Sequence, residues 1–321
     1  MKIEERFRRV DVETIRAPAP TVEDYRRTPP APDRIVGGSR PRNFVSGLPV
    51  FSIITIVRNG KATIERCIES VAKQTYPNIE YVIGDGASTD GTLDILRRYD
   101  RDITYWHSEK DRKPEDAFNK MVPQTSGKYV AVLLGDDWLD ENFAAESVRA
   151  LEAGNLDFVF GDVDLYENEG LLYRRRGNPR FARTLRYEVS FNTPSWSVRR
   201  SIFDDIGLFK MVNVSPEYDW LLRAHLAGYK GAHDPSIVYN FRFGGNSSVH
   251  AFLGYREVRE MAIANGGNRI VAWMHYLRWA IRHEARVALE TFVPADLMLR
   301  LRRLRRNFLD RQSSVSGQEG R

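Results

Sequence analysis

The chain has 321 residues with 42% apolar side chains, enough for one large domain or two small ones around a substantial core. A single cysteine, Cys67, excludes an intramolecular disulfide framework and a cysteine-rich zinc site, and suits a reducing compartment. The net charge of +5 suggests nucleic acid or an anionic membrane as a partner. However, residues 268–321 carry 11 Arg, no Lys and five acids, a net of +6, so the preceding residues sum to about −1.

Two features of the chain bear on its compartment. No apolar run approaches the roughly 18 to 20 residues that a helix needs to cross a bilayer. The first residues, MKIEERFRRVDVE, are charged where a signal peptide would need an apolar stretch. We therefore expect a cytoplasmic protein that is either soluble or peripherally attached to a membrane.

Residues 1–49 differ in composition from the rest of the chain. They hold seven of the 15 prolines, with scattered charges and no sustained apolar period. This composition predicts a Pro-rich N-terminal arm that is extended or partly disordered.

From Phe51 the sequence alternates between strand and helix patterns. FSIITIV is a β-branched run typical of a strand buried on both faces. Four apolar residues then fall on one helical face: Ile64, Cys67, Ile68 and Val71. Further strands are predicted at 80–84, 103–106 and 129–134, with helices between them. This alternation predicts an α/β domain with a mainly parallel, Rossmann-like sheet, helices on both faces, and a ligand crevice at the C-terminal strand ends.

Beyond residue 157 the pattern is mixed. FVFGDVDLY and LLYRRR are expected to pair as a hairpin, PEYDWLLRAHLAG to form a helix, and PSIVYNFRF to form a strand. Two helical segments rich in Arg, Trp and Leu flank Pro294, and residues 312–321 are expected to be disordered.

The loop from Gly84 to Thr92 follows a strand and opens a helix. Its small residues allow a ligand to approach the backbone, and Asp85 at the strand end can accept a hydrogen bond from a base or ribose. The alternative is a plain turn in which Thr89 or Asp90 caps the helix.

Asp136 and Asp137 directly follow the most apolar strand. Two adjacent acids at a buried strand end repel each other, and a hard divalent cation, held together with substrate phosphate oxygens, would compensate. The alternative is a pair of acids at a helix start. The doubling and the position favour a metal or nucleotide role.

Glu217 and Asp219 stand at the start of the helix predicted in PEYDWLLR. A carboxylate here could act as a general base, and only one of the two need point inward. Acids at a helix start are the alternative.

The three groups of acids are Asp85, Asp136 with Asp137, and Glu217 with Asp219. Their order and spacing resemble family 2 of the inverting, nucleotide-sugar-dependent glycosyltransferases with the GT-A fold. The likeness runs from about Pro49 to Ser248 and is closest to members that assemble bacterial surface polysaccharides. Residues 51–92 look like the family's opening block. The stretch Ser108-Glu109-Lys110-Asp111 through Asp116-Ala117-Phe118-Asn119-Lys120 is similar to a subgroup pattern of Ser-Glu-x-Asp followed by Asp-Ala-x-Asn-Lys.

The resemblance implies a role for most of these residues. Val57 and Asn59 would touch the nucleotide, Asp85 would hold the base, and Asp111 would lie near the nucleotide pocket. Asp136 and Asp137 would fill the Asp-x-Asp region, one near the ribose or phosphate and one on Mn²⁺ or Mg²⁺. Leu134 stands where the first Asp of that motif is usual, which leaves the metal with fewer protein ligands.

On the acceptor side, Glu217 aligns with the family's catalytic base and Asp219 with the second acid, and we favour Glu217. Trp196 could stack on an acceptor sugar, or be an ordinary buried tryptophan. Arg242 opens a loop, to residue 248, that is similar to one that closes over the diphosphate. His233 and His107 are interpreted as structural.

The C-terminal segments have the composition of interfacial helices, with Trp273, Leu277 and Trp279 among several arginines. Binding to anionic lipid would bring the site to a lipid-linked acceptor. The alternatives are a helix packed on the catalytic domain or a dimer contact, and the oligomeric state is left open.

These expectations divide the chain into an arm (1–49), a GT-A catalytic domain (50–265), basic amphipathic helices (266–311) and a tail (312–321). The catalytic domain consists of a nucleotide-binding half (50–140) and an acceptor half (141–265). The expected activity is inverting transfer of a sugar from a UDP- or GDP-type donor to a glycan hydroxyl in surface polysaccharide synthesis. The alternatives are a nucleotidyltransferase and a nucleotide-sugar-binding protein with weak catalysis. Nucleic acid is disfavoured because the crevice residues are mostly acidic.

Overall fold

A computed structural model describes residues 10–41, 43–167, 169–243 and 251–292. The chain divides into two compact units, 1–269 and 270–321. The strands are β1 (Ile35–Gly37), β2 (Phe51–Val57), β3 (Ile79–Asp85), β4 (Tyr105–Ser108), β5 (Tyr129–Leu134), β6 (Trp138–Leu139), β7 (Phe158–Glu167), β8 (Gly170–Arg175), β9 (Trp196–Arg199) and β10 (Gly231–Arg242). The α-helices are α2 (Val12–Arg16), α3 (Val22–Arg27), α4 (Ile64–Ala72), α5 (Thr92–Arg98), α6 (Pro114–Met121), α7 (Phe143–Ala153), α8 (Ser201–Ile206), α9 (Pro216–Leu226), α10 (Ala251–Ala264) and α11 (Arg269–Phe292).

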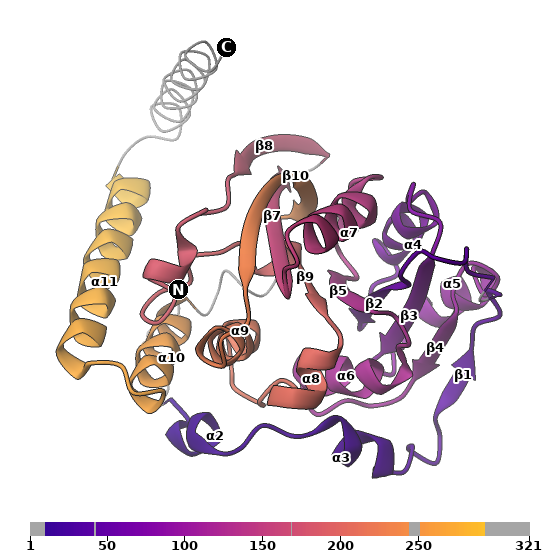
Figure 1. Cartoon of the computed structure of the whole chain (residues 1–321), viewed down its shortest axis with the longest axis horizontal. Helices are drawn as coiled ribbons and strands as arrows, with labels where there is room; N and C mark the ends of the chain where they lie inside the picture. Colours follow the sequence, from indigo (N-terminus) through magenta and orange to yellow (C-terminus); the bar gives the residue numbers. More distant parts are fainter. Residues whose placement is uncertain (1–9, 42, 168, 244–250, 293–321) are drawn as a thin grey trace. The chain divides into compact units, whose positions relative to one another are not determined.

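The first unit is built on one mixed sheet (Figure 1). Its strand order is β1-β4-β3-β2-β5-β9-β7-β10-β6, and β8 pairs with β7. The four neighbours β4, β3, β2 and β5 are parallel, as the strand and helix alternation predicts. Beyond β5 the sheet becomes mixed, because β9 runs antiparallel to both β5 and β7. The parallel part therefore contains the strands whose C-terminal ends were expected to bind the ligand.

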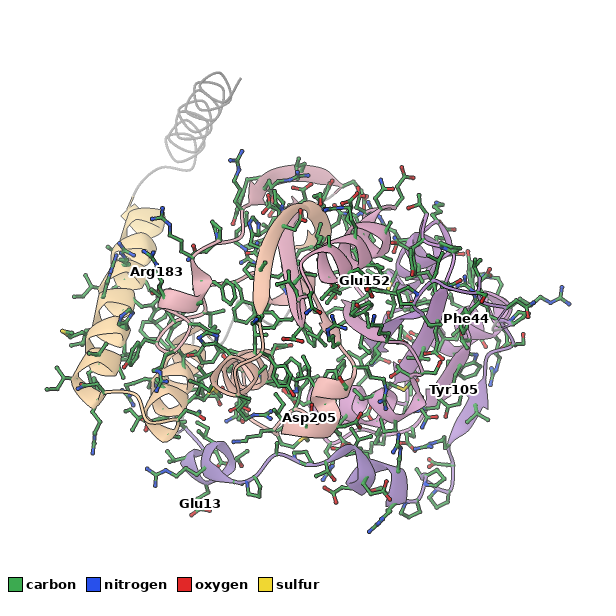
Figure 2. The ribbon with its side chains drawn as sticks, in the orientation of Figure 1. Glu13, Phe44, Tyr105, Glu152, Arg183 and Asp205 are labelled. Atoms are coloured by element: carbon green, nitrogen blue, oxygen red, sulfur yellow. The ribbon has the colours of Figure 1, made fainter. Side chains whose placement is uncertain are left out.

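Helices cover both faces of this sheet, and side chains fill the two layers (Figure 2). Alternate residues of a strand point to opposite faces, so Ile54 packs with Phe118 of α6 and Trp220 of α9, while Ile53 packs with Cys67 of α4 and Phe143 of α7. Helices α6 and α9 therefore pack on the same face of the sheet.

The described part of the N-terminal arm contains two short helices and a strand, and it packs on the rest of the first unit. Its α2 and α3 bury Ile15 and Val22, and β1 pairs antiparallel with β4 at the sheet edge. The backbone N–H of Leu208 donates to the carbonyl of Pro20 at 2.7 Å. Figure 1 shows the arm running past α2 and α3 to β1. The two short helices, α2 and α3, were not predicted from the sequence.

The second half of the domain contains the expected elements together with others that were not predicted, among them β9 and α8. The hairpin is confirmed, because β7 and β8 pair antiparallel. A short strand, β6, intervenes before α7, since Trp138 and Leu139 pair with β10. A further helix, α10, forms at 251–264, where no helix was predicted.

In the second unit, α11 extends to Phe292. None of the helices in the described ranges is long and apolar enough to cross a membrane. The second basic helix, expected after Pro294, and the expected disordered tail at 312–321 lie outside the described residues.

Candidate functional site

The C-terminal ends of the parallel strands meet at one edge of the sheet. Val57 of β2 is in register with Asp85 of β3, and Asp85 with Ser108 of β4. On the other side of β2, the backbone N–H of Gly135, the residue after β5, donates to the carbonyl of Ile56 at 3.2 Å. The polar residues that follow β2, β3 and β5 therefore gather along this edge.

Two loops at this edge are joined by hydrogen bonds through Asn59. Its backbone N–H donates to the Ser88 hydroxyl at 2.7 Å, and its side-chain oxygen accepts from the Thr89 N–H at 3.0 Å. Asn59 and Ala87 both have positive φ, 53° and 55°. Two left-handed non-glycine residues at one strand edge are a form of local strain that concentrates at functional sites.

Asp85 is fully buried between these loops. Its carboxylate accepts from the Ser88 N–H at 2.9 Å and from the Ser108 hydroxyl at 2.6 Å. These bonds fix the carboxylate at the expected base-binding position.

Asp111 lies beside the same loops, next to Gly86. A methyl group built on Gly86 would lie 3.2 Å from Oδ2 of Asp111, so a side chain there would crowd that carboxylate. Nζ of Lys120 is 2.7 Å from Oδ1 of Asp111. Burial raises the pKa of Asp111, and Lys120 opposes the rise.

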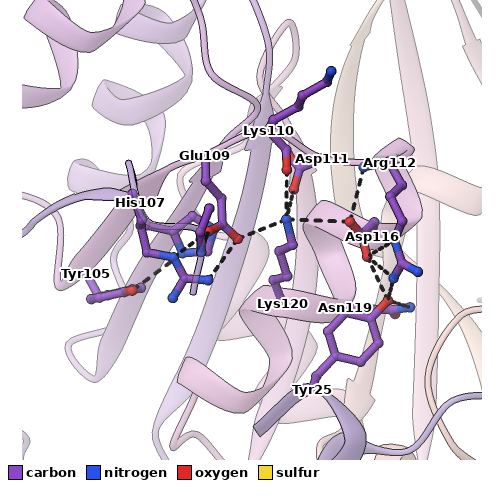
Figure 3. Close-up of polar contacts among 12 residues, drawn as sticks. Tyr25, Tyr105, His107, Glu109, Lys110, Asp111, Arg112, Asp116, Asn119 and Lys120 are labelled. Atoms are coloured by element: carbon purple, nitrogen blue, oxygen red, sulfur yellow. Dashed lines mark hydrogen bonds and ion pairs between the residues drawn. The ribbon is translucent and has the colours of Figure 1, made fainter. Parts of the chain in front are cut away.

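Lys120 is the centre of a network of three carboxylates (Figure 3). Besides Asp111, it lies 2.9 Å from Glu109 and 3.5 Å from Asp116. Burial alone would raise the pKa of Glu109, but Arg34 and then Lys120 hold it well below its usual range. The block of residues 108–120 that carries the family resemblance is thus one ionic cluster on α6 and the loop before it.

The N-terminal arm completes this cluster. Arg34 makes a two-pronged contact with Glu109, at 2.7 and 2.8 Å, and the Tyr25 hydroxyl donates to Asp116 at 2.9 Å. The contribution of the arm was not anticipated from the sequence. No local pattern in the sequence reports these contacts, because Arg34 and Glu109 are 75 residues apart and Tyr25 and Asp116 are 91 apart.

Asp137 is buried at the end of β5 and held by β10. Its Oδ2 accepts from the Tyr239 hydroxyl and its Oδ1 from the backbone N–H of Arg242, both at 2.8 Å. Burial, with the neighbouring charge of Asp136, raises the pKa of Asp137 to about 8. Sequence reasoning missed Tyr239, because a tyrosine inside a strand gives no sign of a polar contact.

Asp136 is half-buried and more open than Asp137. Burial raises its pKa, and the positive charge of Arg242 opposes that rise. Among the described residues, its carboxylate has no ion-pair partner within 4 Å. It is therefore the acid with free oxygen atoms for a ligand.

These two acids fit a divalent cation only if the substrate helps to bind it. Within the described ranges, no three His, Cys, Asp or Glu side chains cluster as a metal site. Mg²⁺ commonly takes one or two carboxylates plus substrate phosphate oxygens, and Leu134 supplies no further ligand. Asp136 would be the direct ligand, and the backbone-held Asp137 would add negative charge or a second ligand.

The guanidinium of Arg242 lies at the end of β10, 3.2 Å from Glu169. It is 39% exposed. Such a group could exchange this surface partner for a phosphate. Residues 244–248, the rest of the expected closing loop, lie outside the described residues.

Glu217 and Asp219 occupy different environments in the first turn of α9. Asp219 is fully buried, with Oδ2 2.9 Å from Arg223 and Oδ1 3.9 Å from Lys210. Glu217 is half-buried, forms no hydrogen bond or ion pair with described residues through its side chain, and has a pKa raised by burial. The open carboxylate is Glu217, and Asp219 is paired like a structural residue.

A third carboxyl, Glu115 in the first turn of α6, was missed. Its burial and the charge of Glu217 raise its pKa to about 7. From the sequence it was one more acid after a proline at a helix start.

Three other candidates lie in the interior. Trp196 is 2% exposed and stacks on Trp220, with ring centroids 5.5 Å apart, so the structure supports the buried-tryptophan alternative. His233 pairs with Asp162 at 2.7 Å, near the opposite end of β10 from Arg242. His107 is buried, and burial lowers its pKa to about 4, so it stays neutral.

The structure thus brings the candidates together in three groups. Val57, Asn59, Asp85 and Asp111 lie at the ends of β2 to β4; Asp136, Asp137 and Arg242 join β5 to β10; and Glu217 lies with Glu115 on the face of α6 and α9. No hydrogen bond or ion pair between described residues joins Glu217 to the Asp136 group.

The chain is similar to known proteins in sequence and in fold. Residues 52–207 match the family model for glycosyl transferase family 2. The chain is 28% identical to glycosyltransferase AglE of Haloferax volcanii, over 72% of this chain and 76% of that protein. It is 36% identical to a PGL/p-HBAD biosynthesis glycosyltransferase of Mycobacterium bovis, over 36% of this chain. The match spans about half of that relative, 47%.

Solved structures with the same fold include two glycosyltransferases. One is residues 1–349 of TarS from S. aureus in complex with UDP-GlcNAc, at 18% identity and a TM-score of 0.55, over 77% of both chains. The other is the mannosyltransferase PcManGT from Pyrobaculum calidifontis with GDP-Man and Mn²⁺, at 18% identity and a TM-score of 0.57, over 87% of this chain and 84% of that one. The chain belongs to glycosyltransferase family 2 and is a glycosyltransferase with the GT-A fold.

Proposed function

We propose that this enzyme transfers a sugar, with inversion, from a UDP- or GDP-type donor to a hydroxyl of a glycan acceptor. The observation that carries the proposal is the group of Asp136, Asp137 and Arg242 at the end of β5. It offers an unpaired carboxylate for a cation and a partly exposed guanidinium for phosphate on the same strand edge as Asp85. The nucleotide sugars named with TarS and PcManGT support a donor of this type.

The binding residues would hold the donor as follows. Val57, Asn59 and Asp85 would contact the nucleoside, and Asp111 would border the pocket, with its position fixed by Lys120. Mn²⁺ or Mg²⁺, when bound at Asp136, supplies positive charge against the leaving diphosphate. Arg242 would add a second positive charge. The donor would thus be oriented before the acceptor arrives.

Glu217 would act as the general base. It would take the proton of the acceptor hydroxyl as the new bond to the anomeric carbon forms and the bond to the diphosphate breaks. A raised pKa suits this role, because a base with its pKa nearer neutrality takes a proton more readily. Asp219, tied to Arg223, would hold the first turn of α9 in place.

We further propose a lipid-linked acceptor in surface polysaccharide synthesis, reached from the cytoplasmic face of the membrane. In α11, Met274, Leu277 and Ile281 are 55%, 51% and 69% exposed, at spacings that share one helical face. Arg278 and Arg282 follow them in the sequence. Apolar residues flanked by arginines suit the surface of an anionic bilayer.

A thermal-shift screen tests the donor class. UDP- and GDP-sugars are added to the full chain with Mn²⁺ or with EDTA, because stabilisation grows with ligand affinity. We expect one nucleotide class to raise the melting temperature only when metal is present. Stabilisation by none of them, or equal stabilisation in EDTA, would contradict the proposal.

A further inference from the structure

Glu115 is a buried carboxyl with an unsatisfied oxygen. Its side chain is 7% exposed, and its Oε2 has no hydrogen-bond partner among the described residues. An unpartnered buried carboxyl oxygen is costly, and a protein normally satisfies it with a proton, a water or a ligand. The free-energy cost of burying this oxygen therefore suggests that Glu115 binds a proton, a water or a ligand.

The charges acting on Glu115 come from three elements. Glu217 on α9 and Glu257 on α10 are negative, and Lys113, at the start of α6, is positive. The ammonium of Lys113 is bound to backbone carbonyls instead, 2.7 Å from that of Met211 and 3.4 Å from that of Val212. No cation among the described residues thus neutralises Glu115 through a direct contact.

Glu257 differs from the other two acids in its bonding. Its two carboxylate oxygens accept the backbone N–H groups of Asn213 and Val214, at 2.8 and 2.9 Å. It therefore anchors the segment that precedes α9. Oδ1 of Asp219 on α9 also lacks a hydrogen bond, but it lies 3.9 Å from Nζ of Lys210. Glu115 and Glu217 are therefore the acids of this group whose side chains have neither a hydrogen bond nor an ion pair with described residues.

We propose that Glu115 is a second acceptor-side residue, which together with Glu217 binds an uncharged, hydroxyl-bearing part of the acceptor. This inference rests on the proposed function, since it takes Glu217 as the base. Carboxyl oxygens bind sugar hydroxyls directly, whereas two unneutralised acids repel phosphate or carboxylate groups. The acceptor end that enters here is therefore a neutral sugar.

The two carboxyls have separate tasks in the transfer. The reacting hydroxyl gives its proton to Glu217, its oxygen bonds to the anomeric carbon, and the diphosphate leaves with the electron pair of the broken bond. Glu115 binds a neighbouring hydroxyl through Oε2 and exchanges no proton in this step. Burial and the charge of Glu217 raise its pKa, so Glu115 can carry a proton at neutral pH and either donate to or accept from that hydroxyl.

A kinetic comparison of Glu115→Gln with a control tests the inference. The control is Glu146→Gln, a first-turn acid of α7 that pairs with Arg149 at the surface. The probes are p-nitrophenyl glycosides of neutral hexoses, and donor affinity is measured separately by titration with the nucleoside diphosphate. We expect Glu115→Gln to raise the KM for the glycoside about tenfold with donor affinity unchanged, and the control to match the wild type.

An unchanged KM, or donor affinity weakened by the same factor, would overturn the inference. A second measurement is needed if Glu115→Gln fails to fold or if the wild type glycosylates none of these probes. A failure of the proposed function itself would instead appear as the absence of metal-dependent donor binding. The second measurement is a ¹³C NMR titration of the side-chain carboxyls of the wild type and Glu217→Gln. In the wild type, one glutamate should titrate near pH 7, and its pKa should be lower in Glu217→Gln. If no glutamate titrates near pH 7, or if its pKa is the same in both proteins, Glu115 and Glu217 do not act as a pair.

Discussion

The Tyr239 hydroxyl donates to Oδ2 of Asp137 at 2.8 Å and accepts the backbone N–H of Leu134 at 3.2 Å. One side chain of β10 thus links the end of β5 to the acid that follows it. The bond that Arg242 donates through its backbone completes the support of Asp137. Asp137 is thus held by β10, although Tyr239 and Arg242 lie 102 and 105 residues after it in the sequence.

Tyr239→Phe tests this link. Loss of a buried hydrogen bond should lower the free energy of unfolding by about 1 kcal/mol and weaken Mn²⁺-dependent donor binding several-fold. Tyr81→Phe is the matched control, because its buried hydroxyl contacts Thr55 at 3.1 Å and forms no hydrogen bond with Asp136 or Asp137. Urea unfolding and calorimetric titration measure the two effects. Equal donor affinity in both variants would show that Tyr239 does not support the site.

Asp136→Asn tests the metal-binding acid. The change keeps the shape of the side chain and removes its charge, so donor binding in Mn²⁺ should fall to the level that the wild type shows in EDTA. Asp94→Asn is the control, since Asp94 is 79% exposed on α5. Isothermal titration with the nucleoside diphosphate measures both. A metal response retained in Asp136→Asn would shift the assignment to Asp137.

Glu217→Gln and Asp219→Asn should fail in different ways. Glu217→Gln should bind the donor normally and lose about 10²- to 10⁴-fold in transfer rate, because the base is gone. Asp219→Asn breaks a buried ion pair with Arg223 and should lower the unfolding free energy by about 3 kcal/mol. Transfer kinetics and urea unfolding separate the two. A stable Asp219→Asn protein without transfer activity would make Asp219 the base.

Arg34→Met tests whether the arm stabilises the network around Lys120. Glu109 has a lowered pKa in the folded state, so its contribution to stability is present above its unfolded pKa and is lost as the pH falls below about 4.5. Without Arg34 the protein should lose about 1 to 3 kcal/mol at pH 7 and show a smaller further loss in acid. Urea unfolding at pH 7 and pH 4 measures this.

The control for that experiment is Arg97→Met, which removes an exposed pair with Asp94. It should change stability by less than about 1 kcal/mol at both pH values. An Arg34→Met protein that behaves like this control would show that the arm is not needed to hold Glu109.

Leu277→Ser with Ile281→Ser tests the proposed membrane surface in the full chain. Truncating two exposed apolar side chains should reduce co-sedimentation with phosphatidylglycerol vesicles about tenfold or more, with nucleotide binding unchanged. The control is Leu171→Ser, an exposed leucine of β8. Equal sedimentation of both proteins would refute the assignment of α11.

The sequence predicts the parallel strands and the helices between them, because each has a clear apolar period, as in Ile64, Cys67, Ile68 and Val71 of α4. It also predicts that Asp85 ends a strand, that Asp136 follows one and that Glu217 lies at the start of a helix. It could not show that β6 precedes α7, because Trp138 and Leu139 become a strand only by pairing with β10.

Contacts between distant segments were equally out of reach. Arg34 and Glu109 are 75 residues apart, and Tyr239 and Asp137 are 102 apart, so no local pattern reports them. Glu115 looked like an ordinary acid at a helix start, and only its burial beside Glu217 distinguishes it. Trp196 shows the reverse, since its place in a segment that resembles the family's acceptor side did not reveal that the core encloses it.

The most direct test of the central claim is the release of nucleoside diphosphate from the sugar donor that stabilises the wild type. It is measured in Mn²⁺ and in EDTA for the wild type, Asp136→Asn and Glu217→Gln. We predict metal-dependent release by the wild type, neither binding nor release by Asp136→Asn, and binding without release by Glu217→Gln. Release that is equal in EDTA, or that survives in both variants, would contradict the account.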